Sequence, residues 1–209
     1  MTLPITVLRF QWRGNPGVPT DLSPLRAPRP HRADAARNYD ALLATAREVF
    51  TEYGADAPLD EIARRVGVGI ATLYRNFPTR ESLLENVYLT EVEAVCRAAD
   101  GLGDLEPWEA VTGWLQRFVD YVATKRAVAT GIDRDSPVYL ACTQALYEAG
   151  GPLLERAQSA GLMRTDVDID DLMRFVMGYT TVNFATPEQR DKMLQVAFDG
   201  LRSGSRQPA

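Results

Sequence analysis

The polar side chains best suited to chemistry in this chain lie close together between positions 69 and 80. Thr72 and Tyr74 carry hydroxyl groups, and Arg80 carries a guanidinium group, all able to donate hydrogen bonds to phosphate oxygens. Arg75 can pair with a guanine edge through two hydrogen bonds or can hold a phosphate, and its residue type leaves both roles open. The cluster therefore predicts contact with a nucleic acid.

Catalytic and metal-binding constellations are missing from the sequence. His31 is the only histidine, so a Ser-His-Asp triad, a Cys-His pair and histidine acid–base catalysis are all disfavoured. Cys96 and Cys142 lie far apart and have no metal-ligand spacing. The carboxylates at positions 166–171 lack the glycine turn and distal glutamate of a calcium loop, and the start of a helix explains them better. We expect no enzyme activity, no metal and no cofactor.

The polar cluster falls on the second of two short predicted helices. Residues 59–66 have an apolar seam and run into Gly67, and a further helix is predicted over residues 70–76. In that second helix Leu73 and Phe77 should point inward. Two short helices joined by a turn of three or four residues that contains glycine make a helix-turn-helix, whose second helix fits the major groove.

The outward residues of the second helix differ in what they can contact. Ile70 and Ala71 have no side-chain hydrogen bonds to give and can pack on thymine methyl groups. Gly69 leaves a backbone amide for a phosphate oxygen, Asn76 offers a donor and an acceptor, and Thr79 can cap the next helix. The predicted DNA-contacting residues are Gly69, Ile70, Ala71, Thr72, Tyr74, Arg75, Asn76, Thr79 and Arg80.

The string from Gly67 to Phe77, GVGIATLYRNF, resembles the signature of TetR-family transcriptional regulators. The resemblance covers about residues 34–90, and residues 139–179 more loosely resemble the C-terminal domain of an actinobacterial subgroup. It implies a homodimer that pairs through its last two helices and encloses a ligand pocket. Asn76 stands where relatives often have histidine, and Pro58 replaces a common capping threonine, so the operator sequence does not carry over.

Helical signals continue along the chain and predict an all-α protein. Apolar residues recur at steps of three and four over residues 34–53 and predict an amphipathic helix. A further helix should run from Glu81 to Ala99 and join the DNA-binding module to the rest of the chain. Later helix starts are predicted at Pro107, at Pro137 and Pro187 behind Ser136 and Thr186, and at Asp168. We predict an N-terminal three-helix helix-turn-helix domain at 31–80 and a larger helical ligand-binding and dimerisation domain at 81–205.

The N-terminal region is rich in proline and basic residues. Residues 1–30 hold 6 of the 13 prolines and predict a disordered arm. Alternatively, Arg26, Arg29 and Arg32 reach along the minor groove. Residues 1–80 have 11 arginines and 8 acidic residues, a net charge of +3, whereas residues 81–209 have 12 basic and 20 acidic residues, a net charge of −8. This asymmetry favours an N-terminal part that meets phosphates.

Aromatic residues in the C-terminal part have two interpretations: a packed core that only stabilises the fold, or the lining of a cavity. A ligand in such a cavity is expected to be mainly apolar, because few internal charges are available to anchor an anion. Glu91 and Glu93, on the connecting helix, are expected to be solvated. The predicted ligand-binding residues are Tyr88, Val92, Val95, Trp114, Phe118, Tyr121, Phe175 and Tyr179. The predicted dimer-interface residues are Leu146, Leu153 and Leu154 on one helix, and Met193, Val196 and Ala197 on another.

These patterns lead to one functional hypothesis and one alternative. The hypothesis is a cytoplasmic, homodimeric transcriptional repressor that binds a palindromic double-stranded DNA operator. A small-molecule effector releases it from the DNA, and no membrane partner is expected. The alternative is a helical ligand-binding or protein-interaction protein without operator recognition. A gel shift with the upstream DNA of the chain's own gene distinguishes the two.

Overall fold

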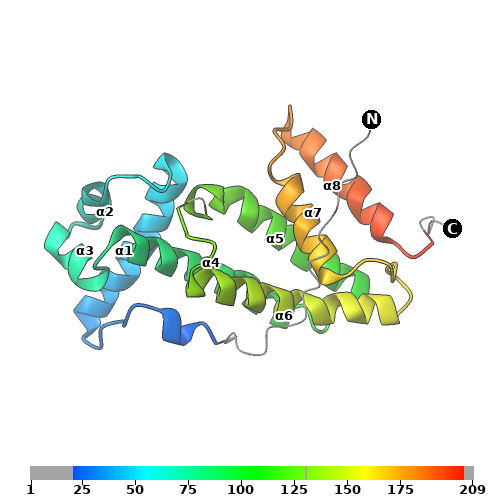
Figure 1. The fold of residues 1–209 in the computed structure, drawn as a ribbon, viewed down its shortest axis with the longest axis horizontal. Helices are drawn as coiled ribbons and strands as arrows, with labels where there is room; N and C mark the ends of the chain where they lie inside the picture. Colours follow the sequence, from blue (N-terminus) through cyan, green and yellow to red (C-terminus); the bar gives the residue numbers. More distant parts are fainter. Residues whose placement is uncertain (1–20, 130, 205–209) are drawn as a thin grey trace.

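Eight α-helices and one short 3-10 helix (η1) make up the part of the chain that the structure describes (Figure 1). The structure is a computed structural model that describes residues 21–129 and 131–204, with the backbone alone for residues 123–129. No strand occurs among these residues, so the all-α prediction is confirmed. The elements are η1 (Ser23–Leu25), α1 (Ala33–Tyr53), α2 (Leu59–Val66), α3 (Ile70–Asn76), α4 (Arg80–Asp100), α5 (Pro107–Ala129), α6 (Pro137–Ser159), α7 (Ile169–Tyr179) and α8 (Pro187–Leu201).

Helices α1, α2 and α3 form a module at one end of an elongated molecule, and α7 and α8 lie toward the other end (Figure 1). The apolar face of α1, from Tyr39 to Phe50, is buried, and α1 packs against α2 and against two longer helices, α4 and α5. Leu73 and Phe77 are both fully buried, as their spacing predicts. Burial of this face supplies most of the stability of helices that are too short to persist alone in water.

Helix α4 connects the module to the rest of the chain. It packs against α1 on one side and against α5 and α6 on the other. Its buried residues include Leu83, Val87 and Leu89, and they belong to a single apolar core that runs through both parts of the molecule. A continuous core lets a displacement in one part move the other.

The helix starts follow the predicted caps. The hydroxyl of Thr79 accepts from the Ser82 amide at 3.0 Å. Ser136 and Thr186 cap α6 and α8 in the same way. Asp168 and Asp171 cap each other's backbone amides at the start of α7, which explains the dense carboxylates there without a metal. Groups of residues able to hold a metal ion are absent from the described part of the chain.

Residues 21–30, which we call the N-terminal strap, are packed against the helices. Leu22 is 4% exposed, and the hydroxyl of Tyr39 in α1 donates to the Ala27 carbonyl at 2.9 Å. The expectation of a disordered arm therefore does not hold for residues 21–30, because an apolar anchor and backbone hydrogen bonds tie them down. The remainder of that prediction, residues 1–20, lies outside the described residues.

No helix in the described ranges combines the length and the apolar character needed to cross a bilayer.

Candidate nucleic-acid interface

The turn between α2 and α3 depends on two glycines with different conformations. Gly67 ends α2 with φ +77°, a left-handed conformation that a residue with a Cβ adopts only with strain. The amides of Gly67 and Val68 donate back to Arg64 and Ala63, at 3.1 and 3.0 Å, and satisfy the last turn of α2. Gly69 is extended and precedes α3 without a side-chain cap. The start of α3 therefore keeps amides available for an anion.

Helix α3 presents an exposed face beside a buried one. Gly69, Ile70, Ala71, Tyr74 and Arg75 are exposed. Arg75 makes no ion pair with any other described residue, so its guanidinium group is available to DNA. The face therefore offers apolar atoms near the start of the helix and polar groups further along. This combination suits base edges and phosphates in a major groove.

The remaining predicted DNA-contacting residues have partners within the chain. The side-chain nitrogen of Asn76 donates to the Thr72 carbonyl at 2.7 Å. This leaves the side-chain oxygen of Asn76 as its group for contacts outside the chain. Arg80 donates through one nitrogen to the Ala55 and Ala57 carbonyls, at 3.0 and 2.5 Å. Arg80 therefore ties the start of α4 to the α1–α2 loop through one guanidinium nitrogen, and its contact with a phosphate stays a prediction. Thr79 is exposed and caps α4.

The arginines of α2 are neutralised by nearby carboxylates. Arg64 and Arg65 both donate to Glu61 at 2.7 Å, and these hydrogen bonds lower the pKa of the Glu61 carboxyl to about 2. Arg65 also pairs with Glu52 and lies over the Tyr53 ring, 5.7 Å from its centroid. The cationic contribution of this module at the DNA-facing side therefore comes chiefly from α3.

A helix-turn-helix with an exposed second helix, joined to a larger helical domain, defines the class of helix-turn-helix transcriptional regulators. The chain matches the family model of bacterial regulatory proteins of the tetR family over residues 42–87. It also matches the model of the C-terminal domain of SbtR-like transcriptional regulators over residues 106–203. The chain belongs to the TetR family of transcriptional regulators, whose members are not enzymes.

Solved structures of the same fold include proteins from actinobacteria. A TetR transcriptional regulator from Streptomyces coelicolor is 37% identical, with 79% of this chain and 99% of that chain covered and a TM-score of 0.66. A TetR regulatory protein from Mycobacterium vanbaalenii is 32% identical, with 83% and 99% covered and a TM-score of 0.63. RolR in complex with resorcinol is 20% identical, with 83% and 92% covered and a TM-score of 0.55, and shares the fold. No curated protein gives a significant match.

The predicted ligand-binding residues on α4 and α5 meet in a buried aromatic cluster. Tyr88 stacks on Tyr139 with ring centroids 6.1 Å apart, and it lies 6.5 Å from Tyr121. Phe118 continues the series from Tyr121 to Trp114, at 6.1 and 5.7 Å. Burial raises the pKa of the Tyr88 and Tyr121 hydroxyls, which keeps both neutral. Tyr139 also joins this cluster, although it is not among the eight predicted ligand-binding residues. Val92 and Val95 are buried beside it.

The far end of the cluster is closed by α6. The indole nitrogen of Trp114 donates to the Val95 carbonyl at 3.3 Å, and a Cβ placed on Gly150 would lie 2.4 Å from the ring. The other two predicted ligand-binding residues do not close this cluster. Phe175 is exposed on α7, and Tyr179 packs against Phe175 and Phe184. Phe175 lies on the outward face of α7, whereas Tyr179 is half-buried and packs against the apolar core.

An open groove lies elsewhere, between the strap, α1 and α4. Its volume is about 540 Å³. Leu43 and Val87 contribute apolar walls, and Arg47 pairs across it with Glu91 at 2.8 Å. Glu91 has a side chain only 14% exposed, so the expectation that it is solvated is wrong.

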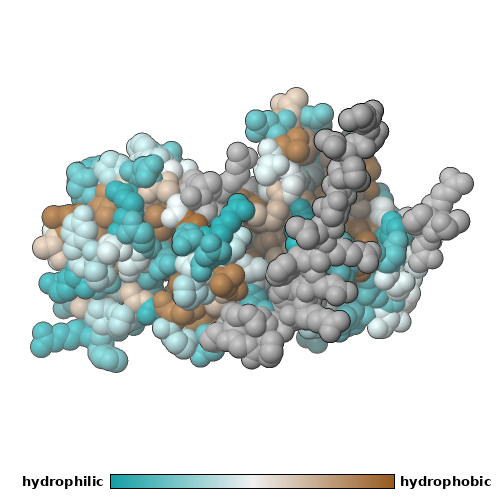
Figure 2. Space-filling view, viewed as in Figure 1, coloured by the Kyte–Doolittle hydropathy of each residue, from teal (hydrophilic) through white to brown (hydrophobic). Residues whose placement is uncertain are grey.

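The residues predicted for the dimer interface fall into two groups. Leu146, Leu153 and Leu154 are buried within the single chain, because α6 packs against both α4 and α5, so they are core residues and not an exposed seam. Met193 and Val196 on α8 are 45% and 55% exposed, and Ala197 is half-buried. Apolar side chains reach the surface over α7 and α8 (Figure 2). The exposed large ones there are Phe175, Met177, Val182, Met193 and Val196.

Proposed function

We propose that this protein is a homodimeric transcriptional repressor that binds a palindromic operator through α3 and is released by a small, mainly apolar ligand. The observation that carries operator binding is the exposed face of α3, with Tyr74 and Arg75 outward and Leu73 inward. Ile70 and Ala71 read bases by apolar contact. Thr72, Tyr74 and Thr79 supply hydroxyl groups to phosphates, together with the amide that Gly69 leaves available.

Dimerisation follows from the reach of a single recognition helix. One helix contacts too few base pairs to select one site in a genome, so a two-fold dimer on a two-fold operator is needed. We assign the interface to the exposed apolar face of α7 and α8. Phe175 and Val196 on that face lose solvent contact when a second copy covers them, which favours association.

The proposed effector site lies in the aromatic cluster between α4 and α5. Tyr88 and Tyr121 supply neutral hydroxyls among apolar rings, a lining that suits a small aromatic or apolar molecule. RolR, which shares the fold, is recorded with resorcinol, a small phenol. A ligand at Tyr88 touches α4, which leads directly to the end of α3, so occupancy can favour the conformation that does not bind DNA.

Footprinting on the DNA upstream of the gene and its neighbours tests the proposal. We expect a protected palindrome of two half-sites whose centres lie about one helical turn apart or a multiple of it. A panel of small phenols should then be screened for release of the complex. If the purified protein binds every DNA with the same affinity and protects no site, the alternative of a helical ligand-binding or protein-interaction protein holds instead.

A further inference from the structure

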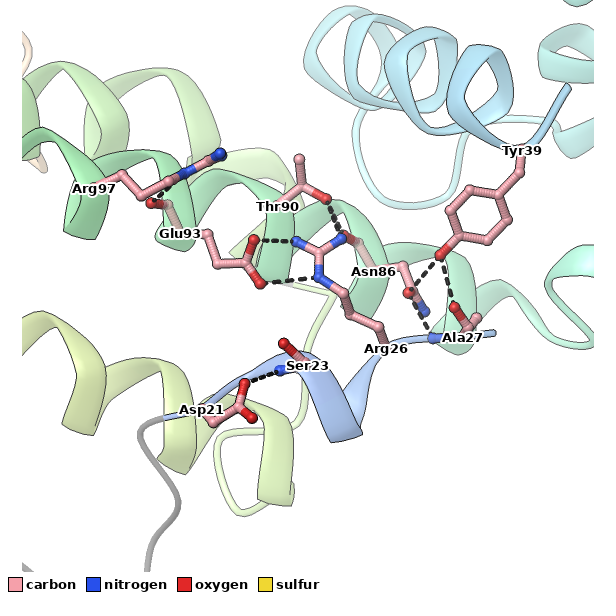
Figure 3. Close-up of polar contacts among 9 residues, drawn as sticks. All are labelled: Asp21, Ser23, Arg26, Ala27, Tyr39, Asn86, Thr90, Glu93 and Arg97. Atoms are coloured by element: carbon pink, nitrogen blue, oxygen red, sulfur yellow. Dashed lines mark hydrogen bonds and ion pairs between the residues drawn. The ribbon is translucent and has the colours of Figure 1, made fainter. Parts of the chain in front are cut away.

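The N-terminal strap is attached to α4 by a two-point ion pair. Arg26 Nε donates to one carboxylate oxygen of Glu93 at 2.9 Å, and a second guanidinium nitrogen lies 2.7 Å from the other oxygen (Figure 3). Arg26 also donates to the Thr90 hydroxyl at 3.2 Å. The side chains of Arg26 and Glu93 are 24% and 28% exposed. A bidentate, partly buried pair holds its geometry better than a solvated one.

The next residue of the strap is held by a buried amide. The Ala27 amide donates to Asn86 Oδ1 at 2.8 Å (Figure 3). Asn86 Nδ2 donates to the Ser82 carbonyl at 2.7 Å. Asn86 is 3% exposed, so its polar atoms have no access to bulk water. Breaking the strap away removes the Ala27 donor from Asn86 Oδ1 and leaves that oxygen with the Tyr39 hydroxyl alone, at 3.3 Å, which is costly.

The same strap residue leads to the recognition helix. The Tyr39 hydroxyl donates to the Ala27 carbonyl, and the Tyr39 ring packs against Phe77 with centroids 4.9 Å apart. Phe77 directly follows α3. A series of contacts thus runs from α4 through the strap and α1 to the end of α3. Residues 21–30 lie outside both ranges that match the family models, so the strap's part in this series is not covered by those models.

We propose that the strap holds the DNA-binding module at a set angle to α4, and that Arg26 and Asn86 are positioning residues for operator binding. This inference rests on the operator binding proposed above. A dimer engages both half-sites only when its two α3 helices have the right separation and orientation. Releasing the strap lowers the fraction of molecules in that arrangement, and the apparent operator affinity falls by the same factor.

Glu93→Ala gives the sharpest test. Alanine favours helix, so α4 should persist, while the ion pair to Arg26 is lost. Removing a negative charge strengthens binding to any DNA by general electrostatics, whereas release of the strap weakens operator binding. We expect faster hydrogen exchange of residues 22–30 and an operator Kd that rises by about threefold to tenfold. Affinity for unrelated DNA should stay equal or increase.

Arg26→Ala provides a second variant, and Arg29→Ala is its matched control. Arg29→Ala removes the same charge from the same strap. Arg29, however, pairs with Asp40 of α1, at 2.8 and 2.6 Å, and not with α4. We expect Arg26→Ala to match Glu93→Ala and Arg29→Ala to stay within about twofold of the wild type.

Three results overturn the inference. The first is that Glu93→Ala binds the operator as tightly as the wild type or more tightly. The second is that hydrogen exchange of residues 22–30 is unchanged in both strap variants. The third is an equal loss of operator affinity in Arg26→Ala and Arg29→Ala, because the lost positive charge alone would then explain the loss. The wild-type footprint, measured first, separates this from the proposed function. If the wild type protects a site and the strap variants bind it equally well, only the strap inference fails. If the wild type protects none, both fail.

Discussion

Tyr74 and Arg80 illustrate how two residues assigned to the same task can differ in surroundings. Both are suited by type to hold phosphates. Tyr74 lies within α3, and Arg80 is the first residue of α4. Tyr74 is 47% exposed on α3. Arg80 is half-buried and donates to two carbonyls of the α1–α2 loop. Substitutions at the two positions should therefore affect different properties.

Tyr74→Phe should weaken DNA binding without changing stability. The substitution removes one hydroxyl donor, and the lost hydrogen bond to a charged phosphate corresponds to about 1–2 kcal/mol of binding free energy. Because phosphate contacts carry no sequence information, the loss should be similar for operator and for unrelated DNA. Fluorescence anisotropy at several salt concentrations measures both. A change in preference between sites, with overall affinity preserved, would assign Tyr74 to base readout.

Arg80→Ala should mainly lower the free energy of unfolding. The Ala55 and Ala57 carbonyls lose their donor, and we expect a loss of about 1–3 kcal/mol. Urea denaturation followed by circular dichroism gives the value. Arg75→Ala is the matched control, because Arg75 has no ion pair among the described residues, and it should leave the unfolding curve in place while reducing DNA affinity. Equal unfolding curves for the wild type and Arg80→Ala would contradict this assignment.

Helix α6 shows how close packing acts at the level of an element. Gly150 faces the Trp114 ring so closely that a methyl group has no room, whereas the neighbouring Gly151 faces open space within 4 Å. Two adjacent glycines in one helix thus have opposite constraints. Gly150 permits α6 to approach the aromatic cluster of α5, and that approach closes the cluster around Trp114.

Gly150→Ala should destabilise the protein and Gly151→Ala should not. Overpacking against the Trp114 ring costs about 1–3 kcal/mol, whereas alanine at position 151 gains about 0.5–1 kcal/mol from reduced backbone freedom in the unfolded chain. Thermal unfolding of the two variants measures the difference, and their opposite signs make each the control for the other. If Gly150→Ala is as stable as Gly151→Ala, the ring has space to move, and the aromatic cluster is looser than it appears in this structure.

At the scale of the whole molecule, the two ends do different work. The α1–α3 module carries the exposed polar face for DNA, while α7 and α8 carry exposed apolar side chains (Figures 1 and 2). The apolar core continues from one end to the other through α4. In a two-fold dimer formed at α7 and α8, both recognition modules lie away from the contact and can reach separate half-sites.

Val196→Glu should dissociate the proposed dimer. Val196 is 55% exposed on α8. In a two-fold dimer each chain contributes one substituted residue to the same interface, so two glutamate charges lose hydration there. We expect the dimer dissociation constant to rise at least about tenfold, measured by sedimentation. Leu140→Glu is the control, because Leu140 is 49% exposed at the start of α6, away from α7 and α8, and should leave the dimer intact. A wild type that sediments as a monomer at micromolar concentration would remove the proposed interface.

The helix-turn-helix and the helix caps were predictable because their causes are local. Gly67 and Gly69, the spacing of Leu73 and Phe77, and the caps at Ser136, Asp168 and Thr186 all involve residues within a few positions of one another. Backbone geometry relates such residues in the same way in any helical protein. The family also followed from this local string.

The sequence by itself therefore determined the all-α class, the starts of most helices, and the burial of Leu73 and Phe77 in the helix-turn-helix. Only the tertiary structure decided which partners distant side chains have. Glu93 pairs with Arg26, 67 positions earlier, and Arg80 reaches carbonyls 23 and 25 positions earlier. Leu146, Leu153 and Leu154 became core residues because α6 packs between other helices. An apolar periodicity shows which face of a helix is buried, but whether its neighbour or a second chain covers that face depends on how the helices are arranged in space.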